Sequence, residues 1–248
     1  MLAFARETGL SETTFVQTAT EPGADYRNRI FDAAKELRLA GHPSLGTAVA
    51  VARARGETEA AYVQQTPAGL QPVDVRLEDR RATASMLQEP PTFGPELDAG
   101  EILPLAGLTA ADADPELPVQ LVGTGVPQVI APVREAALAR ARADYTRIES
   151  VLDGFEAIVL YLAACDPGRG AARARAFGHT AAMGEDPATG SAAGPLMAYL
   201  HARTEIDRLE IDQGIEMGRP ARLSCAFEGD RPRVGGAAAI LIEGTVSL

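Results

Sequence analysis

The chain has 248 residues, of which 46% are hydrophobic and 23% are charged, and its formal net charge is −11. This is ordinary globular composition, and the length allows one large domain or two modest ones. The acidic balance and the absence of a long basic run argue against nucleic acid or an anionic membrane surface as a partner. No stretch approaches the roughly 20 apolar residues of a membrane span, and no signal-peptide pattern is present, so the sequence predicts a cytoplasmic protein.

The rare residues exclude several kinds of chemistry. Lys35 is the only lysine and lies in a polar stretch, which makes a pyridoxal Schiff base improbable. The three histidines share no metal-ligand spacing with one another or with the cysteines, which argues against a zinc site, while carboxylate-rich sites stay open. Cys165 lies at the end of a predicted strand and Cys225 in the core of another, as small buried hydrophobic residues do.

The first predicted helix begins within the segment "HPSLGTA" at 42–48 and runs over 44–55. Its residues are small and apolar on nearly all sides, which predicts a buried helix. Gly56 stands where a C-terminal cap is expected. An alternating stretch from 61 to 77, broken at Pro67 and Gly69, predicts strands after this helix.

A segment rich in proline, glycine and acidic residues separates two halves of the chain. It covers 87–119, and its composition predicts a crossover with one short helix near 96–105. We therefore predict an N-terminal domain over 1–118 and a C-terminal domain over 119–237, with a last strand at about 238–248 that returns to the first domain. The second half then begins with a hairpin-like pair of strands around Gly123 to Gly125.

The second predicted helix begins within the segment "DPATGSA" at 186–192 and runs over 191–202. Pro195 lacks an N–H group, so the prediction places it in the first turn. The residues after it leave no polar face, which is typical of a helix buried on every side. Strand-like segments broken at Gly214 and Gly218 follow.

The two segments in which the predicted helices begin repeat one sequence pattern. "HPSLGTA" and "DPATGSA" both fit [HD]-P-x-x-G-[ST]-A, and each follows a strand-like Arg-x-Phe, at Arg29 to Phe31 and at Arg175 to Phe177. Chance similarity between two glycine-containing helix starts is the alternative explanation. The shared strand order favours two similar halves with a ligand cleft between them, into which both helix N-termini point.

Five ordered segments carry a family resemblance that runs almost end to end. They are "LSETTFV", "AGHPSLGTA", "GTGVPQVIAPV", "EDPATGSAAG" and "QGIEMGRP". Together they resemble the PhzF family of phenazine-biosynthesis-like isomerases. The resemblance implies an α+β fold of the diaminopimelate epimerase-like type: two pseudo-equivalent domains, each a curved, mostly antiparallel sheet wrapped around a central helix. It also implies a cofactor-independent isomerase, a homodimer, and a small carboxylated substrate bound in the interdomain cleft.

The resemblance assigns the catalytic role to Glu12 in "SETTF". One carboxylate would take a proton from one carbon and return it to another, acting as base and acid in turn. We expect its pKa to be raised toward neutrality by burial in an apolar cleft, with Leu10 and Phe15 as wall residues. From the residues alone, an ordinary surface glutamate at the start of a strand is the alternative.

The resemblance also implies that His42, Asp186 and Ser191 bind the substrate and assist the proton transfer. We expect His42 and Asp186 to occupy equivalent places at the two helix starts. A histidine in a turn, an acid that favours the positive end of a helix, and a serine cap are the alternatives. The remaining candidate substrate-binding residues surround the predicted anion site at the helix N-termini. Glycine there allows backbone N–H groups to approach a ligand closely, and the alternative is that it only permits a tight turn. They are Gly41, Gly46, Thr189 and Gly190.

Two further comparisons narrow the predicted activity. Epimerases and proline racemases that share the fold use two cysteine thiols near the helix starts, and this chain has His42 and Asp186 there instead. Members of the family usually begin with two strands and a glycine-asparagine-proline turn, whereas this sequence starts inside the helix that leads to Glu12. The alternative function is therefore a non-catalytic, dimeric small-acid-binding protein that has lost activity with its N-terminal segment.

Overall fold

The computed structural model describes residues 1–38, 40–79 and 81–246. The chain forms two compact units. The first unit contains Met1–Leu87 together with the chain from Gly235 onward, and the second contains Gln88–Val234. In the described residues, no helix is long and apolar enough to cross a membrane.

The first unit is a sheet built around one helix, α2 (Gly41–Arg55). Its strands follow the order β1-β2-β4-β5-β6-β15, in which β2 and β4 run parallel. Small residues such as Ala48 and Ala52 let the helix approach the sheet closely, and they pack with Tyr26, Tyr62 and Val73. The other elements are α1 (Leu2–Thr8), β1 (Thr13–Gln17), β2 (Tyr26–Phe31), β3 (Glu36–Leu37), β4 (Glu59–Thr66), β5 (Gly69–Glu78), β6 (Arg81–Leu87) and β15 (Arg231–Ala239).

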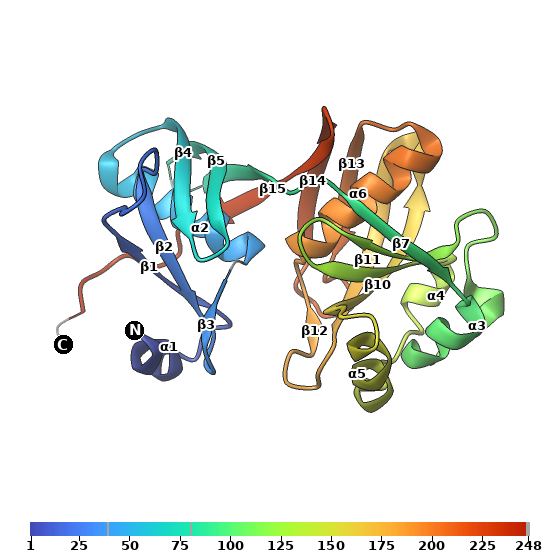
Figure 1. The fold of residues 1–248 in the computed structure, drawn as a ribbon. Helices are drawn as coiled ribbons and strands as arrows, with labels where there is room; N and C mark the ends of the chain where they lie inside the picture. The colour runs from blue at the N-terminus through green and yellow to red at the C-terminus, as the bar shows by residue number, and fades with distance from the viewer. Residues whose placement is uncertain (39, 80, 247–248) are drawn as a thin grey trace. The chain divides into compact units, whose positions relative to one another are not determined.

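The second unit is a larger sheet with helices on both faces (Figure 1). Its strands follow the order β15-β14-β13-β11-β10-β9-β8-β7, mostly antiparallel, with parallel pairs β9·β10 and β11·β13. The buried helix α6 (Gly190–Thr204) covers one face, and α4 (Glu135–Leu138) and α5 (Tyr145–Asp153) lie against the other. Every residue from Ala192 to Leu200 is buried, as the apolar pattern predicted.

The remaining elements of the second unit are the other strands of its sheet, the short strand β12 and several short helices. They are β7 (Thr92–Leu97), α3 (Ala99–Ile102), η1 (Leu103–Ala106), η2 (Ala110–Asp112), β8 (Val119–Gly123), β9 (Pro127–Pro132), β10 (Val159–Asp166), η3 (Pro167–Arg169), β11 (Ala171–Gly178), β12 (Glu185–Asp186), β13 (Arg208–Gln213) and β14 (Ala221–Glu228). The hairpin predicted around Gly123 to Gly125 is the antiparallel pair β8·β9.

The division between the units differs from the boundary predicted near Pro118. The chain divides after Leu87, because the segment 88–118 is bound to the second unit throughout. Its strand β7 pairs with β8, and Leu103 and Leu105 pack with the core under α5. Proline and glycine in this segment mark turns within the unit rather than a linker between units. The final strand, β15, ends at Ala239, so residues 240–246 lack the strand predicted there but do group with the first unit.

The internal repeat is present in the structure as a repeated side-chain arrangement. In the first unit, Arg29 on β2 makes a bidentate contact with Glu36 on β3, at 2.8 and 2.6 Å, and its guanidinium lies over the Phe31 ring at 5.2 Å. Phe31 is the register partner of Glu36.

The second unit repeats this arrangement with equivalent residues. Arg175 on β11 makes a bidentate contact with Glu185 on β12, with both distances 2.8 Å, and lies over Phe177 at 5.0 Å. Phe177 is the register partner of Glu185. In each unit a 15-residue helix follows the short strand. The two halves therefore share this side-chain arrangement and the order strand, short strand and helix, which is more than a short sequence pattern shared by chance.

The helix starts differ from the prediction in two ways. Helix α2 already includes His42 in its first turn, whereas Asp186 lies on β12 and α6 begins only at Gly190. His42 and Asp186 are thus not equivalent in position, because the first helix starts earlier relative to the shared pattern. The placement of Pro195 in the first turn was also wrong. It lies inside α6, where its missing N–H removes the bond to the Ser191 carbonyl, a loss that the fully buried packing of the helix outweighs.

Candidate functional site

Glu12 and His42 form a pair within the first unit. Glu12 immediately precedes β1, and His42 lies in the first turn of α2. The distance from His42 Nε2 to Glu12 Oε2 is 3.0 Å. The Glu12 side chain is 20% exposed and the His42 ring 51% exposed, so the carboxylate lies beneath an imidazole that solvent reaches.

Contacts between α2 and β1 fix the geometry of this pair. Thr47 Oγ1 on α2 lies 2.7 Å from Thr14 Oγ1 on β1 and 2.7 Å from the Pro43 carbonyl. On β1, the Phe15 ring packs edge-on against Phe31, with centroids 5.6 Å apart. Since Thr14 is only two residues from Glu12, the helix start and the carboxylate are held in one rigid arrangement.

The pKa of Glu12 is lowered from its ordinary value, which contradicts the raised pKa predicted from sequence. Burial is the largest single influence and raises the pKa, but hydrogen bonds from His42 and Ser11 and the charge of His42 together outweigh it. Leu10 does not wall the site as predicted, because its side chain is 61% exposed. The carboxylate is therefore ionised at neutral pH.

Removing the imidazole should reverse this balance. We expect the pKa of Glu12 to rise in His42→Leu, because burial persists while the hydrogen bond and the charge of His42 are lost. A pKa lowered by folding contributes stability above the unfolded-state value, and this stability is lost as pH falls through the folded value. A variant whose folded pKa lies above the unfolded value no longer has this contribution at neutral pH.

Carboxyl ¹³C NMR titration of Glu12 measures this shift directly. Ser11→Ala is the matched comparison, and it should raise the Glu12 pKa less, since Ser11 supplies a hydrogen bond without a charge. A Glu12 pKa that is unchanged or falls in His42→Leu would contradict this balance of influences.

Asp186 lies in the second unit and is the last residue of β12, four residues before α6 begins at Gly190. Its Oδ2 accepts a hydrogen bond from the Thr189 hydroxyl at 2.7 Å, and its Oδ1 accepts a longer one from the Ala188 N–H at 3.4 Å. Gln213, at the end of β13, donates to the Asp186 carbonyl at 2.7 Å. The carboxylate is half-buried, so part of it is open to solvent while one oxygen is held from within the unit.

No side chain caps the start of α6. Thr189 is its N-cap residue but makes no side-chain capping bond, since its hydroxyl contacts Asp186 instead. The first N–H groups of a helix have no partner within it, so those of Gly190 and Ser191 are available to an acceptor. The Gly190 carbonyl accepts from Gln88 Nε2 at 2.9 Å, which holds this turn in place. The N-cap position belongs to Thr189, so Ser191 does not cap the helix.

The corresponding start of α2 is similar but carries different glycines. Its N-cap residue, Ala40, has no side chain that can cap, and Gly41 is the first helical residue. Gly46 lies inside the helix and is exposed, and a Cβ built on it would meet no atom within 4 Å. A tight turn therefore does not explain Gly46, whereas the close approach of a ligand remains a prediction.

The two cysteines are unsuited to thiol chemistry. Burial raises the pKa of Cys165 to about 12, and it also raises that of Cys225, which lies in the core under α6. Both thiols are therefore protonated at neutral pH. In the described residues, no group of three histidine, cysteine or acidic side chains could hold a metal ion.

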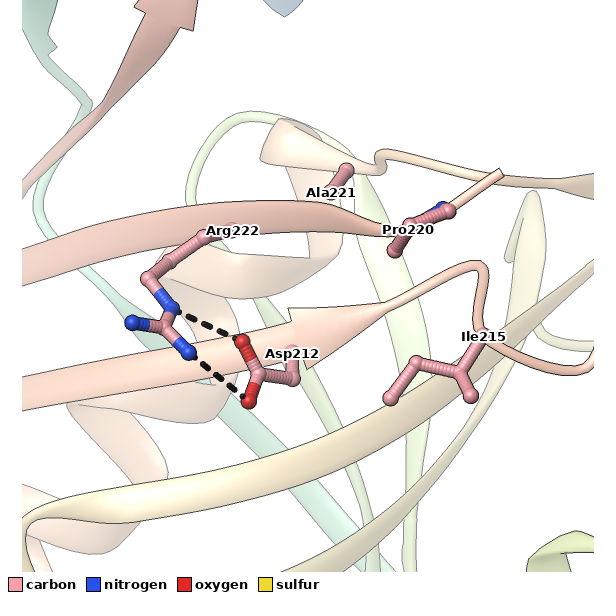
Figure 2. A pocket seen from close by; sticks show the side chains of 5 residues that line it. All are labelled: Asp212, Ile215, Pro220, Ala221 and Arg222. Carbon is pink, nitrogen blue, oxygen red and sulfur yellow. Dashed lines mark hydrogen bonds and ion pairs between the residues drawn. The ribbon is translucent and has the colours of Figure 1, made fainter. Parts of the chain in front are cut away.

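A surface pocket of about 410 Å³ lies at the β13–β14 turn, away from these residues. Figure 2 shows its lining, in which Arg222 makes a bidentate contact with Asp212 at 2.8 and 3.1 Å. Asp212 and Arg222 are register partners on β13 and β14, and successive strand residues point to opposite faces, so this pair points away from the face that carries Gln213.

Sequence reasoning assigned no role to Gln213, Tyr161 or Gln88. A signal for Gln213 was present, because it continues the buried face of β13 after Leu209 and Ile211. A polar residue at an apolar position of a strand indicates a buried hydrogen-bond partner. Gln88 lies in the segment interpreted as a crossover and carries no comparable signal.

The chain is similar to known proteins over both units. The family model described as phenazine biosynthesis-like protein (PhzC-PhzF) matches residues 1–244. The chain is 34% identical to trans-2,3-dihydro-3-hydroxyanthranilate isomerase of Pseudomonas aeruginosa, over 94% of this chain and 81% of that protein.

Several solved structures share the fold, two of them epimerases. One is a predicted epimerase of Pseudomonas aeruginosa, PA4716, with a TM-score of 0.80, 30% identity, and coverage of 98% of this chain and 88% of that one. The other is a hydroxyproline epimerase of Agrobacterium vitis, with a TM-score of 0.62, 17% identity, and coverage of 92% and 72%. The epimerase-like α+β fold predicted from sequence is confirmed.

Proposed function

This chain belongs to the phenazine biosynthesis-like (PhzC-PhzF) family and is an isomerase, and we propose that it moves a proton between two carbons of a small carboxylated metabolite. Glu12 is the proposed acid and base. The observation that carries the proposal is the ionised, largely buried Glu12 carboxylate, with its Oε2 3.0 Å from His42 Nε2. A carboxylate in this state can accept a proton as soon as a substrate reaches it.

The proposed reaction needs no co-reactant. Glu12 takes a proton from one carbon, and the electron pair of the broken C–H bond enters the conjugated system of the substrate. The Glu12 carboxylic acid then returns a proton to a second carbon, which forms the new C–H bond and restores the carboxylate. The substrate and product therefore have the same composition, and Glu12 ends the reaction in the state in which it began.

The lowered pKa of Glu12 places a condition on this mechanism. Proton transfer is most efficient when the pKa of the catalytic group lies near the working pH. We propose that a bound substrate displaces the His42 contact and excludes water, since each change raises the pKa of Glu12 toward that range. His42 then contacts the substrate or stabilises developing negative charge.

The second unit supplies the proposed carboxylate-binding groups. The N–H groups at the start of α6, from Gly190 and Ser191, and the positive end of the helix dipole favour an anion. Asp186 is proposed to assist the proton transfer. We propose that Glu12 and Asp186 act on one substrate molecule in an interdomain cleft, as the family resemblance implies.

A panel of small unsaturated carboxylic acids tests the activity. It should include trans-2,3-dihydro-3-hydroxyanthranilate, the compound named in the relative's activity. NMR should show conversion of at least one acid to a positional isomer by the wild-type chain without added metal or cofactor. Saturable binding of these acids without turnover of any would contradict the isomerase and favour the non-catalytic acid-binding alternative.

The family resemblance also leads us to propose a homodimer. Sedimentation equilibrium should then give twice the 26.0 kDa chain mass.

A further inference from the structure

The segment "QGIEMGRP", which the proposed mechanism leaves without a role, begins with a buried side chain that contacts the Asp186 loop. Gln213 is 1% exposed, and both ends of its amide are hydrogen-bonded. Its Nε2 lies 2.7 Å from the Asp186 carbonyl and 2.9 Å from Thr189 Oγ1. Its Oε1 lies 3.3 Å from the Thr189 N–H and 2.8 Å from the Tyr161 hydroxyl.

Two backbone groups determine which way the Gln213 amide points. The Asp186 carbonyl can only accept a hydrogen bond, so the atom beside it must be the NH₂ group. The Thr189 N–H can only donate, so the atom beside it must be the amide oxygen. The reversed amide would place an acceptor against the carbonyl and a donor against the N–H in a buried place, which is costly.

The orientation of the Gln213 amide determines the direction of the hydrogen bonds that involve the Thr189 and Tyr161 hydroxyls. Thr189 Oγ1 accepts from Gln213, so the single hydroxyl hydrogen of Thr189 remains for Asp186 Oδ2, at 2.7 Å. The buried Tyr161 hydroxyl must donate to the Gln213 oxygen. The side-chain donors therefore run one way, from Tyr161 to Gln213, from Gln213 to Thr189, and from Thr189 to the Asp186 carboxylate.

Gly214, the residue after Gln213, also packs against the Asp186 loop. Gly214 has φ +76°, and a Cβ built on it would lie 2.3 Å from the Arg219 carbonyl and 2.9 Å from the Pro187 carbonyl. Only glycine allows this approach to Pro187, the neighbour of Asp186. Strand β13 thus holds the Asp186 loop through a side chain and through close backbone packing.

We propose that Gln213 and Thr189 are positioning residues that orient the Asp186 carboxylate for the isomerase reaction. This inference rests on the proposed role of Asp186. It changes the role expected for Thr189, which is buried and directs its hydroxyl toward Asp186 rather than toward a substrate.

The test compares Thr189→Val, which keeps the shape of the side chain and removes the hydroxyl, with Thr189→Ser, which keeps the hydroxyl. We expect Thr189→Val to lower kcat about tenfold, the order of one lost hydrogen bond to a carboxylate, with little change in KM. Thr189→Ser should restore kcat to within about threefold of wild type. Tyr161→Phe should lower kcat less, because it acts through Gln213.

Matched controls separate positioning from general loss of packing. Tyr199→Phe removes another buried tyrosine hydroxyl, which donates to the Pro118 carbonyl at 2.7 Å. Thr204→Val removes a hydroxyl bonded to the Leu200 carbonyl at the far end of α6. Both should leave kcat unchanged while thermal unfolding shows that all variants fold.

Combination with Asp186→Asn separates this inference from the proposed function. In that background Thr189→Val should have no further effect on kcat. A wild-type kcat in Thr189→Val, when Asp186→Asn is impaired, would overturn the positioning role and leave the proposed function intact. If Asp186→Asn is fully active, the proposed role of Asp186 falls.

A crystal structure of Thr189→Val decides the orientation claim independently of activity. We expect the Asp186 carboxylate to turn away from its wild-type rotamer. An unchanged rotamer would overturn the inference.

Discussion

Replacement of Glu12 by glutamine should lower kcat by about 10²–10⁴-fold, the usual contribution of a general acid-base residue. Glutamine keeps the size of the side chain and can still contact His42, but it cannot accept a proton from carbon. KM should change little, because the proposed carboxylate-binding groups lie elsewhere in the chain. Steady-state kinetics on the best substrate from the acid panel measures both parameters.

Glu36→Gln is the matched control for this variant. Glu36 is in the same unit, is partly buried, and contacts a cationic side chain, Arg29, as Glu12 contacts His42. It should keep kcat within about twofold of wild type, because a partly exposed ion pair contributes little. Equal losses in the two variants would mean that Glu12 acts through folding rather than catalysis.

Replacement of Arg175 by methionine should lower the free energy of unfolding by about 3–5 kcal/mol, as expected when one partner of a buried ion pair is removed. Arg175 is 6% exposed. It binds both oxygens of Glu185 and donates to the Leu138 and Ala141 carbonyls, at 2.6 and 3.0 Å. The variant leaves this carboxylate without its arginine partner and removes one hydrogen bond from each of the two carbonyls. Urea unfolding at neutral pH measures the loss.

The internal repeat provides the control. Arg29→Met removes the equivalent arginine from its bidentate contact with Glu36, but this pair is more exposed and Arg29 lacks the two carbonyl contacts. We expect a loss of about 0–1 kcal/mol, typical of exposed ion pairs. A loss as large as that of Arg175→Met would show that burial does not control the energy of this arrangement.

The sequence was sufficient to predict the repeated architecture because its signals are local. Helices that are apolar on all sides, the Gly56 cap and the turn residues each report on their own segment. Arg29 and Arg175 also marked equivalent strands. The acids that they bind were not predicted, since short strands such as β3 and β12 lack a periodic pattern.

The parts that the sequence could not predict depend on competition between contacts. The direction of the Glu12 pKa shift follows from hydrogen bonds that outweigh burial, and no spacing in the sequence reveals which is larger. The position of Pro195 inside α6 likewise depends on packing that outweighs one lost hydrogen bond. Gln213 reaches Thr189 only because strand β13 follows the helix and returns beside β11.

The most direct test of the central claim is the fate of the transferred proton. The isomerisation should be run in deuterated water with the wild-type chain and with Glu12→Gln, and the product should be examined by NMR. We expect deuterium at the carbon that receives the proton in the wild-type product, and none above background with Glu12→Gln. Equal deuterium incorporation at carbon with both proteins would contradict Glu12 as the group that carries the proton.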